Sequence, residues 1–137
     1  MKDWQSQAHV RWDCQFHVVT IPKYRRLVFY GRLRREVGSI LRGLCRQRGI
    51  DIAEAKAMPD HIHMLLRIPP KYSVAMTMGY LKGKSAIRIH RDLMKTKGTM
   101  FGRHFWARGY CVSAVGLDKE VIRAYIRDQE RREKNMD

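Results

Sequence analysis

Two extended stretches of this chain, residues 50–58 and 61–68, are separated only by Pro59-Asp60. Both are rich in apolar residues, and Pro-Asp is typical of a tight turn. Every other pair of predicted strands is separated by a helix. The expected order is therefore strand, helix, strand, strand, helix, strand, helix, and its first six elements form the split β-α-β pattern of a ferredoxin-like sandwich.

The other elements follow from periodicity and from their boundary residues. The predicted strands are residues 13–21 and 110–115, the predicted helices are 31–48, 73–94 and 118–132, and 95–103 is a predicted basic loop. Pro22 ends the first strand, and Gly49 is a natural helix stop. Ser73 and Asp118 are suited to cap the helices that follow them.

These elements predict an α+β fold, with a ferredoxin-like (RRM-like) antiparallel sheet covered by two helices. The opposite face of the sheet is left for a ligand or for the last helix, residues 118–132. A length of 137 residues fits one domain with a real hydrophobic core, so residues 1–137 are expected to form a single domain.

The charge of the chain indicates a polyanionic partner. Lys and Arg number 28 against 13 acidic residues, a formal net charge of +15. Such an excess repels itself in a folded protein, and nucleic acid is the commonest partner that offsets it. Ribosomal and membrane-surface proteins share this property, so charge alone does not decide the function.

Composition also bears on the cellular compartment. The three cysteines are scattered and form no Cys-x-x-Cys pair, so neither a zinc ribbon nor a disulfide framework is indicated. No stretch approaches the roughly 18 apolar residues that span a membrane. We expect a cytoplasmic, nucleoid-associated protein with no membrane partner.

A His-x-His triplet, His61-Ile62-His63, lies in the predicted strand 61–68. Strand side chains alternate, so both imidazoles share one face and are able to hold one divalent ion. Two ordinary half-buried histidines remain the alternative.

Tyr125 and Gln129 lie four residues apart in the last predicted helix, on one stripe with Val121, Ile122 and Ile126. The stripe predicts that both side chains pack toward protein. Tyr125 is then either a core aromatic or a functional hydroxyl. Gln129 favours the second reading, because an amide on an apolar stripe needs a partner such as a metal ion.

Longer motifs extend over nearly the whole chain. They are residues 22–26 (PKYRR), 59–65 (PDHIHML), 68–74 (IPPKYSV), 78–85 (MGYLKGKS), 105–110 (FWARGY), 115–117 (VGL) and 125–130 (YIRDQE). With these motifs the chain resembles the IS200/IS605 family of transposases, members of the HUH single-tyrosine (Y1) nuclease superfamily. Cys111 and Ala114 depart from the family pattern but touch no motif residue.

The resemblance implies a role for each site residue. His61 and His63 match the metal ligands, Gln129 matches the third protein ligand, and Tyr125 matches the nucleophile. The implied metal is Mg²⁺ or Mn²⁺, and imidazole suits Mn²⁺ better. The implied reaction is metal-dependent cutting and rejoining of single-stranded DNA through a 5′-phosphotyrosine, without ATP.

The resemblance also implies partners. The DNA is expected to carry imperfect hairpins at the transposon ends, and the protein is expected to be a homodimer whose active site is shared or contained within one chain. Candidate phosphate-binding residues are Arg25, Arg26, Lys82, Lys84, Arg88, Arg103 and Arg108. Each of them is otherwise a solvated surface charge. His17 either faces the active site or lies on an ordinary polar surface.

Two alternatives remain from sequence. A REP-associated tyrosine transposase would use the same chemistry in a domesticated role. A non-catalytic nucleic-acid-binding module on the same fold would have no metal dependence and no special use for Gln129.

Overall fold

A computed structural model describes residues 5–7, 10–23, 29–94, 105–114 and 119–136. Its central feature is an antiparallel sheet of β3 (Gln15–Thr20), β4 (Asp51–Met58), β5 (His61–Arg67) and β6 (Cys111–Ser113). The strand order is β4-β5-β3-β6, so the first and third of these strands along the chain are central. That order is the one expected of a ferredoxin-like fold, and the predicted fold class is confirmed.

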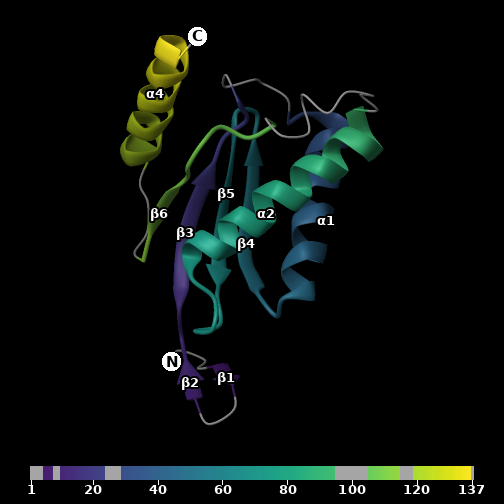
Figure 1. The fold of residues 1–137 in the computed structure, drawn as a ribbon, viewed down its shortest axis with the longest axis vertical. Helices are drawn as coiled ribbons and strands as arrows, with labels where there is room; N and C mark the ends of the chain where they lie inside the picture. Colours follow the sequence, from purple (N-terminus) through teal and green to yellow (C-terminus); the bar gives the residue numbers. More distant parts are fainter. Residues whose placement is uncertain (1–4, 8–9, 24–28, 95–104, 115–118, 137) are drawn as a thin grey trace.

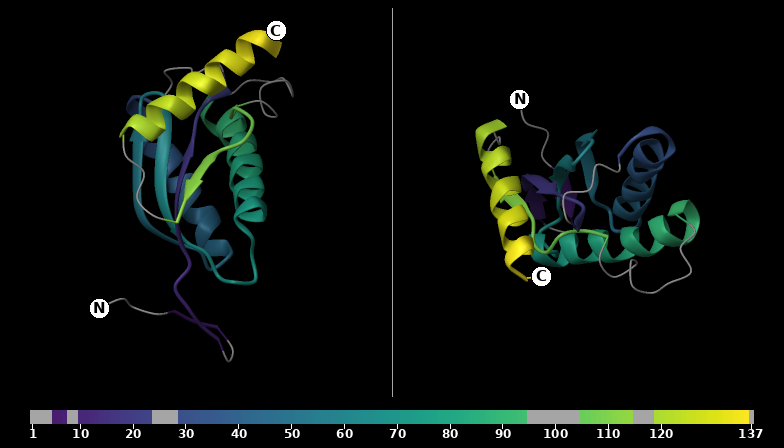
Figure 2. Two further views of the ribbon diagram at one scale, coloured as in Figure 1. Left: turned by 90° about the vertical axis from the view of Figure 1, so that its left-hand side faces the viewer. Right: turned by 90° about the horizontal axis from the view of Figure 1, so that it is seen from above.

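Two helices, α1 (Gly31–Gln47) and α2 (Val74–Arg88), cover one face of this sheet. A third helix, α4 (Lys119–Met136), lies on the opposite side (Figures 1 and 2). The arrangement confirms that the last helix takes the face that α1 and α2 leave free. It also places any site on that face between the sheet and α4.

The main hydrophobic core lies between the sheet and the α1–α2 layer. Ile62, Met64 and Leu66 of β5 are buried there together with Val37 and Leu41 of α1. Alternation along β5 explains this, because every second side chain faces the helices and the others stay half-buried on the α4 side. Full burial of each large apolar side chain contributes about 1.5–3 kcal/mol relative to exposure.

Boundary residues behave as their chemistry predicts. The Ser73 hydroxyl accepts a hydrogen bond from the Met76 amide at 3.0 Å, which caps α2. Gly49 follows α1 with φ of 66°, a left-handed conformation that glycine adopts without a Cβ penalty. Both positions confirm the predicted helix limits.

The structure corrects several element boundaries. The helix expected over residues 73–94 ends at Arg88 and continues as a π-helix, Ile89–Met94, in which the consecutive residues Ile89 and His90 are both buried. Of the strand expected over 110–115, the described residues form only β6, which pairs with three residues of β3, and residue 115 lies outside the described residues. The first strand is Gln15–Thr20 rather than 13–21, and α4 extends to Met136 rather than to 132.

A short N-terminal hairpin was not predicted. It consists of β1 (Gln5–Gln7) and β2 (Val10–Trp12), and it projects beyond the end of the main sheet (Figure 1). Each strand has three residues, too few for a period-two pattern to stand out in the sequence. The loop expected at 95–103 lies outside the described residues.

Candidate active site

Three imidazoles gather on the sheet face that α4 covers. His61 and His63 project from β5 on the side opposite the main core, as the alternation predicts. From the neighbouring strand β3, His17 reaches the same place: its Nδ1 lies 3.1 Å from Nε2 of His63. The two ring centroids are 5.2 Å apart. His17 therefore belongs to the histidine cluster, a position that the sequence had left open.

Asp60, in the turn before β5, orients the first histidine of the triplet. Its Oδ1 lies 2.9 Å from Nδ1 of His61. A carboxylate at this distance favours the tautomer with the proton on Nδ1, which leaves Nε2 of His61 with a free lone pair. Sequence reasoning assigned Asp60 only to the turn, although an acidic residue next to a candidate ligand was the available signal.

The surroundings of His63 favour its neutral form. Burial lowers the pKa of His63 below its ordinary value, and the nearby His17 and His61 rings lower it further, while the Glu54 carboxylate acts in the opposite direction. A neutral imidazole has a lone pair that is able to bind a metal ion or accept a proton. The local electrostatics therefore suit ligand binding better than charge pairing.

His61 and His63 open into a cleft of about 1050 Å³ between the sheet and α4. Its sheet side is formed by Lys56, Met58, Asp60, His61 and His63, and its helix side by Glu120, Ile122, Arg123, Ala124, Ile126 and Arg127. Within the described ranges, no group of three or more His, Cys, Asp or Glu side chains is placed to hold a metal ion.

Tyr125 lies on another flank of α4 and does not line this cleft. It packs in a second hydrophobic cluster with Val19, Ile21, Ala107 and Cys111. Its hydroxyl is buried and makes no hydrogen bond to any residue in the described part of the chain. Burial raises the pKa of Tyr125 to about 12, and the neighbouring Cys111 adds to the rise. In this arrangement the phenol stays protonated near neutral pH.

Gln129 is also buried, with 7% of its surface exposed, and like Tyr125 it is absent from the walls of the cleft. The prediction that Tyr125 and Gln129 pack toward protein is therefore confirmed, whereas Val121, which the sequence placed on the same stripe, is exposed. Arg123 and Arg127 line the histidine cleft from the side of the helix, and neither Tyr125 nor Gln129 is among its lining residues.

The candidate DNA-binding residues lie in different surroundings. Lys84 and Arg108 are exposed, and Arg88 is half-buried at the end of α2. Lys82 donates hydrogen bonds of 2.7 Å to the carbonyl oxygens of Ala107 and Gly109. It therefore ties α2 to the segment that leads into β6. Arg25, Arg26 and Arg103 lie outside the described residues.

Among the helices that the structure describes, none combines the length and apolar character needed to cross a membrane.

Solved structures with the same fold define the class of protein. The crystal structure of a candidate transposase from Deinococcus radiodurans R1 aligns with a TM-score of 0.76 and 27% identity, over 94% of this chain and 98% of that one. A REP-associated tyrosine transposase bound to a REP hairpin shares the fold, with a TM-score of 0.56 and 13% identity over 92% of this chain and 68% of that one. The fold is that of single-tyrosine transposases.

Sequence comparison then identifies the family. Residues 10–129 match the family described as "Transposase IS200 like". The chain is 51% identical over 129 residues to the transposase for insertion sequence element IS200 of Salmonella typhimurium, covering 94% of this chain and 85% of that protein. It is 29% identical over 123 residues to the ISDra2 transposase TnpA of Deinococcus radiodurans, covering 89% and 88%. The chain belongs to the IS200-like transposase family, a family of enzymes that cut and rejoin DNA.

Proposed function

We propose that this transposase cuts and rejoins single-stranded DNA beside hairpins at the ends of an insertion sequence, through a 5′-phosphotyrosine on Tyr125. The observation that carries the proposal is the cleft in which His61 and His63 face α4, the helix that bears Tyr125 and Gln129. A non-catalytic binding module has no evident use for a cluster of oriented imidazoles beside a tyrosine helix.

The histidines fit a divalent metal ion. The lowered pKa of His63 and the carboxylate on Nδ1 of His61 both leave an imidazole lone pair available. We propose His61, His63 and the side-chain oxygen of Gln129 as ligands of Mn²⁺ or Mg²⁺, with Mn²⁺ the better match to imidazole. When bound, the metal would polarise the scissile phosphate and offset the charge that develops on it.

Tyr125 supplies the nucleophile in this proposal. Its phenolic oxygen forms a bond to phosphorus while the bond to the 3′ oxygen breaks, and the proton lost by the phenol is matched by one gained by the 3′ oxygen. The product is a 5′-phosphotyrosine and a free 3′-hydroxyl. Because the phosphodiester energy stays in the covalent bond, a 3′-hydroxyl is able to reverse the step on another strand without ATP.

We further propose that two subunits share the active site. In one chain, Tyr125 is buried against Cys111 and its pKa is about 12, while another flank of α4 lines the histidine cleft. A catalytic arrangement therefore requires α4 to meet the histidines differently. A homodimer satisfies this requirement if α4 of one subunit packs against the histidine cleft of the other. The fold of each subunit then stays unchanged.

The DNA substrate is argued from charge and from a structural relative. The net charge of +15 favours a polyanion, and the REP-associated relative was solved with a hairpin bound. We propose phosphate contacts for Arg25, Arg26, Lys82, Lys84, Arg88, Arg103 and Arg108. Identity of 51% to IS200 transposases favours a mobile-element role over the REP-associated one.

The test is a denaturing gel of the protein incubated with a labelled single-stranded hairpin from the DNA that flanks its gene, with and without Mn²⁺. We expect a covalent protein–DNA band that requires Mn²⁺ and disappears in Tyr125→Phe and in His61→Ala/His63→Ala. Tyr125→Phe should bind the same DNA almost as well as the unaltered protein. Absence of any adduct with the unaltered protein would overturn the catalytic proposal.

A further inference from the structure

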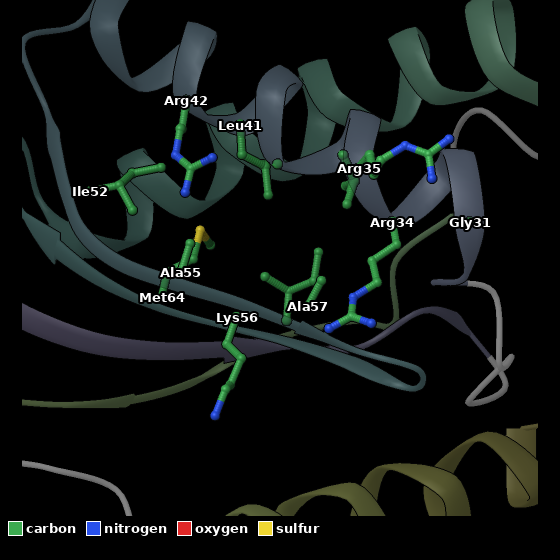
Figure 3. A pocket seen from close by; sticks show the side chains of 13 residues that line it. Gly31, Arg34, Arg35, Leu41, Arg42, Ile52, Ala55, Lys56, Ala57 and Met64 are labelled. Carbon is green, nitrogen blue, oxygen red and sulfur yellow. The ribbon is translucent and has the colours of Figure 1, made fainter.

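A second cavity lies on the opposite side of edge strand β4, beneath α1 (Figure 3). Its volume is about 510 Å³, within the roughly 300–1,000 Å³ typical of small-ligand sites. Apolar side chains of α1, β4 and β5 form its inner walls, among them Leu41, Ile52 and Met64 respectively. The cavity is therefore large and apolar enough to accept a planar organic group.

The rim of this cavity is strongly basic. Arg34, Arg35 and Arg42 of α1 and Lys56 of β4 line it, and none of its lining residues in the described part of the chain is acidic. Within the described part of the chain, none of the three arginine side chains forms an ion pair or a hydrogen bond. Figure 3 shows Arg34 and Arg42 extending from α1 toward β4. Unpaired guanidinium groups around an apolar cavity suit a ligand that has an apolar ring and a negatively charged group next to the ring.

Lys56 links this cavity to the histidine cleft. Lys56 lines both the cavity and the cleft, and it is the register partner of His63 in the β4–β5 pair. In Figure 3 its side chain projects from β4 away from α1. Because β4 is at the edge of the sheet, a flexible ligand is able to pass around it from one face to the other.

We infer that the α1–β4 cavity is a nucleotide subsite for the single-stranded DNA that leads to the scissile phosphate. An unpaired base enters the apolar cavity, the arginines contact the flanking phosphates, and the backbone passes Lys56 to reach His63. Guanidinium planes also stack on bases, so the rim arginines are suited to contact both the base and the phosphate of a nucleotide. The inference rests on the proposed function, since it names part of the substrate of that same site.

The apolar cavity is tested with a matched pair of glycines in α1. Gly38 lines the cavity, and a Cβ atom added there would contact only the end of the Arg42 side chain, at 3.7 Å. Gly43 does not line the cavity, and a Cβ atom added there would have open space around it. Gly38→Leu therefore fills the cavity without changing charge, and Gly43→Leu is the control. Both substitutions favour the helix, and thermal unfolding checks that both proteins fold.

The probe is a fluorescent hairpin with single-stranded flanks, prepared as a series in which one abasic site moves along each flank. For the unaltered protein and Gly43→Leu we expect one flank position at which base removal weakens binding about tenfold. Gly38→Leu should bind the intact probe about tenfold more weakly and lose no further affinity at that position. Equal abasic profiles for Gly38→Leu and Gly43→Leu would overturn the subsite.

The charged rim is tested separately with two double variants of equal net charge. Arg34→Gln/Arg42→Gln alters the rim, and Arg32→Gln/Arg46→Gln alters exposed positions of the same helix that do not line the cavity. We expect the rim variant to bind about tenfold more weakly and with a lower salt slope than the control. Equal affinity of the two variants would contradict the assignment of the rim.

The outcome of these binding tests is independent of the test of the proposed catalytic function. If the unaltered protein forms the Tyr125 adduct while the cavity variants bind like their controls, the subsite is wrong and the proposed chemistry stands. If no adduct forms but the contrast in affinity remains, the subsite stands and the proposed chemistry is wrong.

Discussion

At the scale of single residues, the candidate site depends on how each imidazole is held. His61 is oriented by Asp60 at 2.9 Å, and His63 is kept neutral by burial beside His17. Partners of this kind fix the tautomer and direction of a ligand and account for a large share of metal affinity.

Asp60→Ala should therefore weaken Mn²⁺ binding by about 10- to 100-fold. Removing the carboxylate frees the His61 ring to rotate and to change tautomer. Isothermal titration with Mn²⁺ measures the effect, and Asp51→Ala, at an exposed position of β4, is the control. Unchanged Mn²⁺ affinity in Asp60→Ala would show that this carboxylate does not orient a metal ligand.

Lys82 contributes to stability in a pH-dependent way. Burial lowers its pKa from the ordinary 10.5 to about 8. Between these two values the unfolded chain binds more protons than the folded one, so the free energy of unfolding should rise as pH increases from about 8 to 10.5. In Lys82→Met this slope should decrease, whereas Lys84→Met, at an exposed position of the same helix, should retain it. Urea unfolding at a series of pH values measures both slopes.

At the scale of secondary-structure elements, the sheet and its helices follow from local patterns that tertiary contacts reinforce. Alternation predicted the strand β5 and its buried face, because every second residue of a strand faces the core. The apolar stripe predicted the helix α1 and its buried face, because every third or fourth residue of a helix faces the same core. The π-helical end of α2 and the shortness of β6 were missed. The π-helical segment contains the buried His90, and β6 pairs with three residues of β3. Both features depend on tertiary packing, which a local sequence pattern does not record.

The candidate site was predictable only in part for the same reason. The His-x-His triplet and the Tyr125–Gln129 stripe are local patterns, so each was visible in the sequence. Their mutual placement is not local: the flank of α4 that meets the histidines is set by packing on Val19 and Cys111. The contact between His17 and His63 joins residues 46 positions apart and likewise needed the fold.

Packing of α4 onto the sheet rests on a small apolar cluster in which Ile126 is buried. Ile126→Ala should cost about 2 kcal/mol of unfolding free energy. Amide hydrogen exchange should quicken throughout α4 while β3 and β5 remain protected, because the main core is untouched. Val121→Ala, a truncation at an exposed position of α4, should change little. Uniform acceleration in sheet and helix would mean that α4 does not open as a separate unit.

At the scale of the whole molecule, the proposed active site has two parts, one on β5 and β3 and one on α4. Sharing between subunits predicts that defects in different halves complement each other.

A heterodimer that combines His63→Ala with Tyr125→Phe should therefore recover adduct formation, although each homodimeric variant is inactive. One of its two sites contains both substitutions and the other contains neither, so about half of the normal adduct yield is expected. Co-expression with two different tags and sequential purification supplies the heterodimer. A heterodimer as inactive as its parents would place the site within one chain.

The most direct measurement is the identity of the residue that carries the DNA. The adduct formed with Mn²⁺ on a labelled hairpin is digested with protease and nuclease, and the modified peptide is sequenced by mass spectrometry. A 5′-phosphonucleotide on Tyr125 is the predicted result. Modification of any other residue, or cleaved DNA with no modified peptide, would contradict the assignment of Tyr125 as the nucleophile.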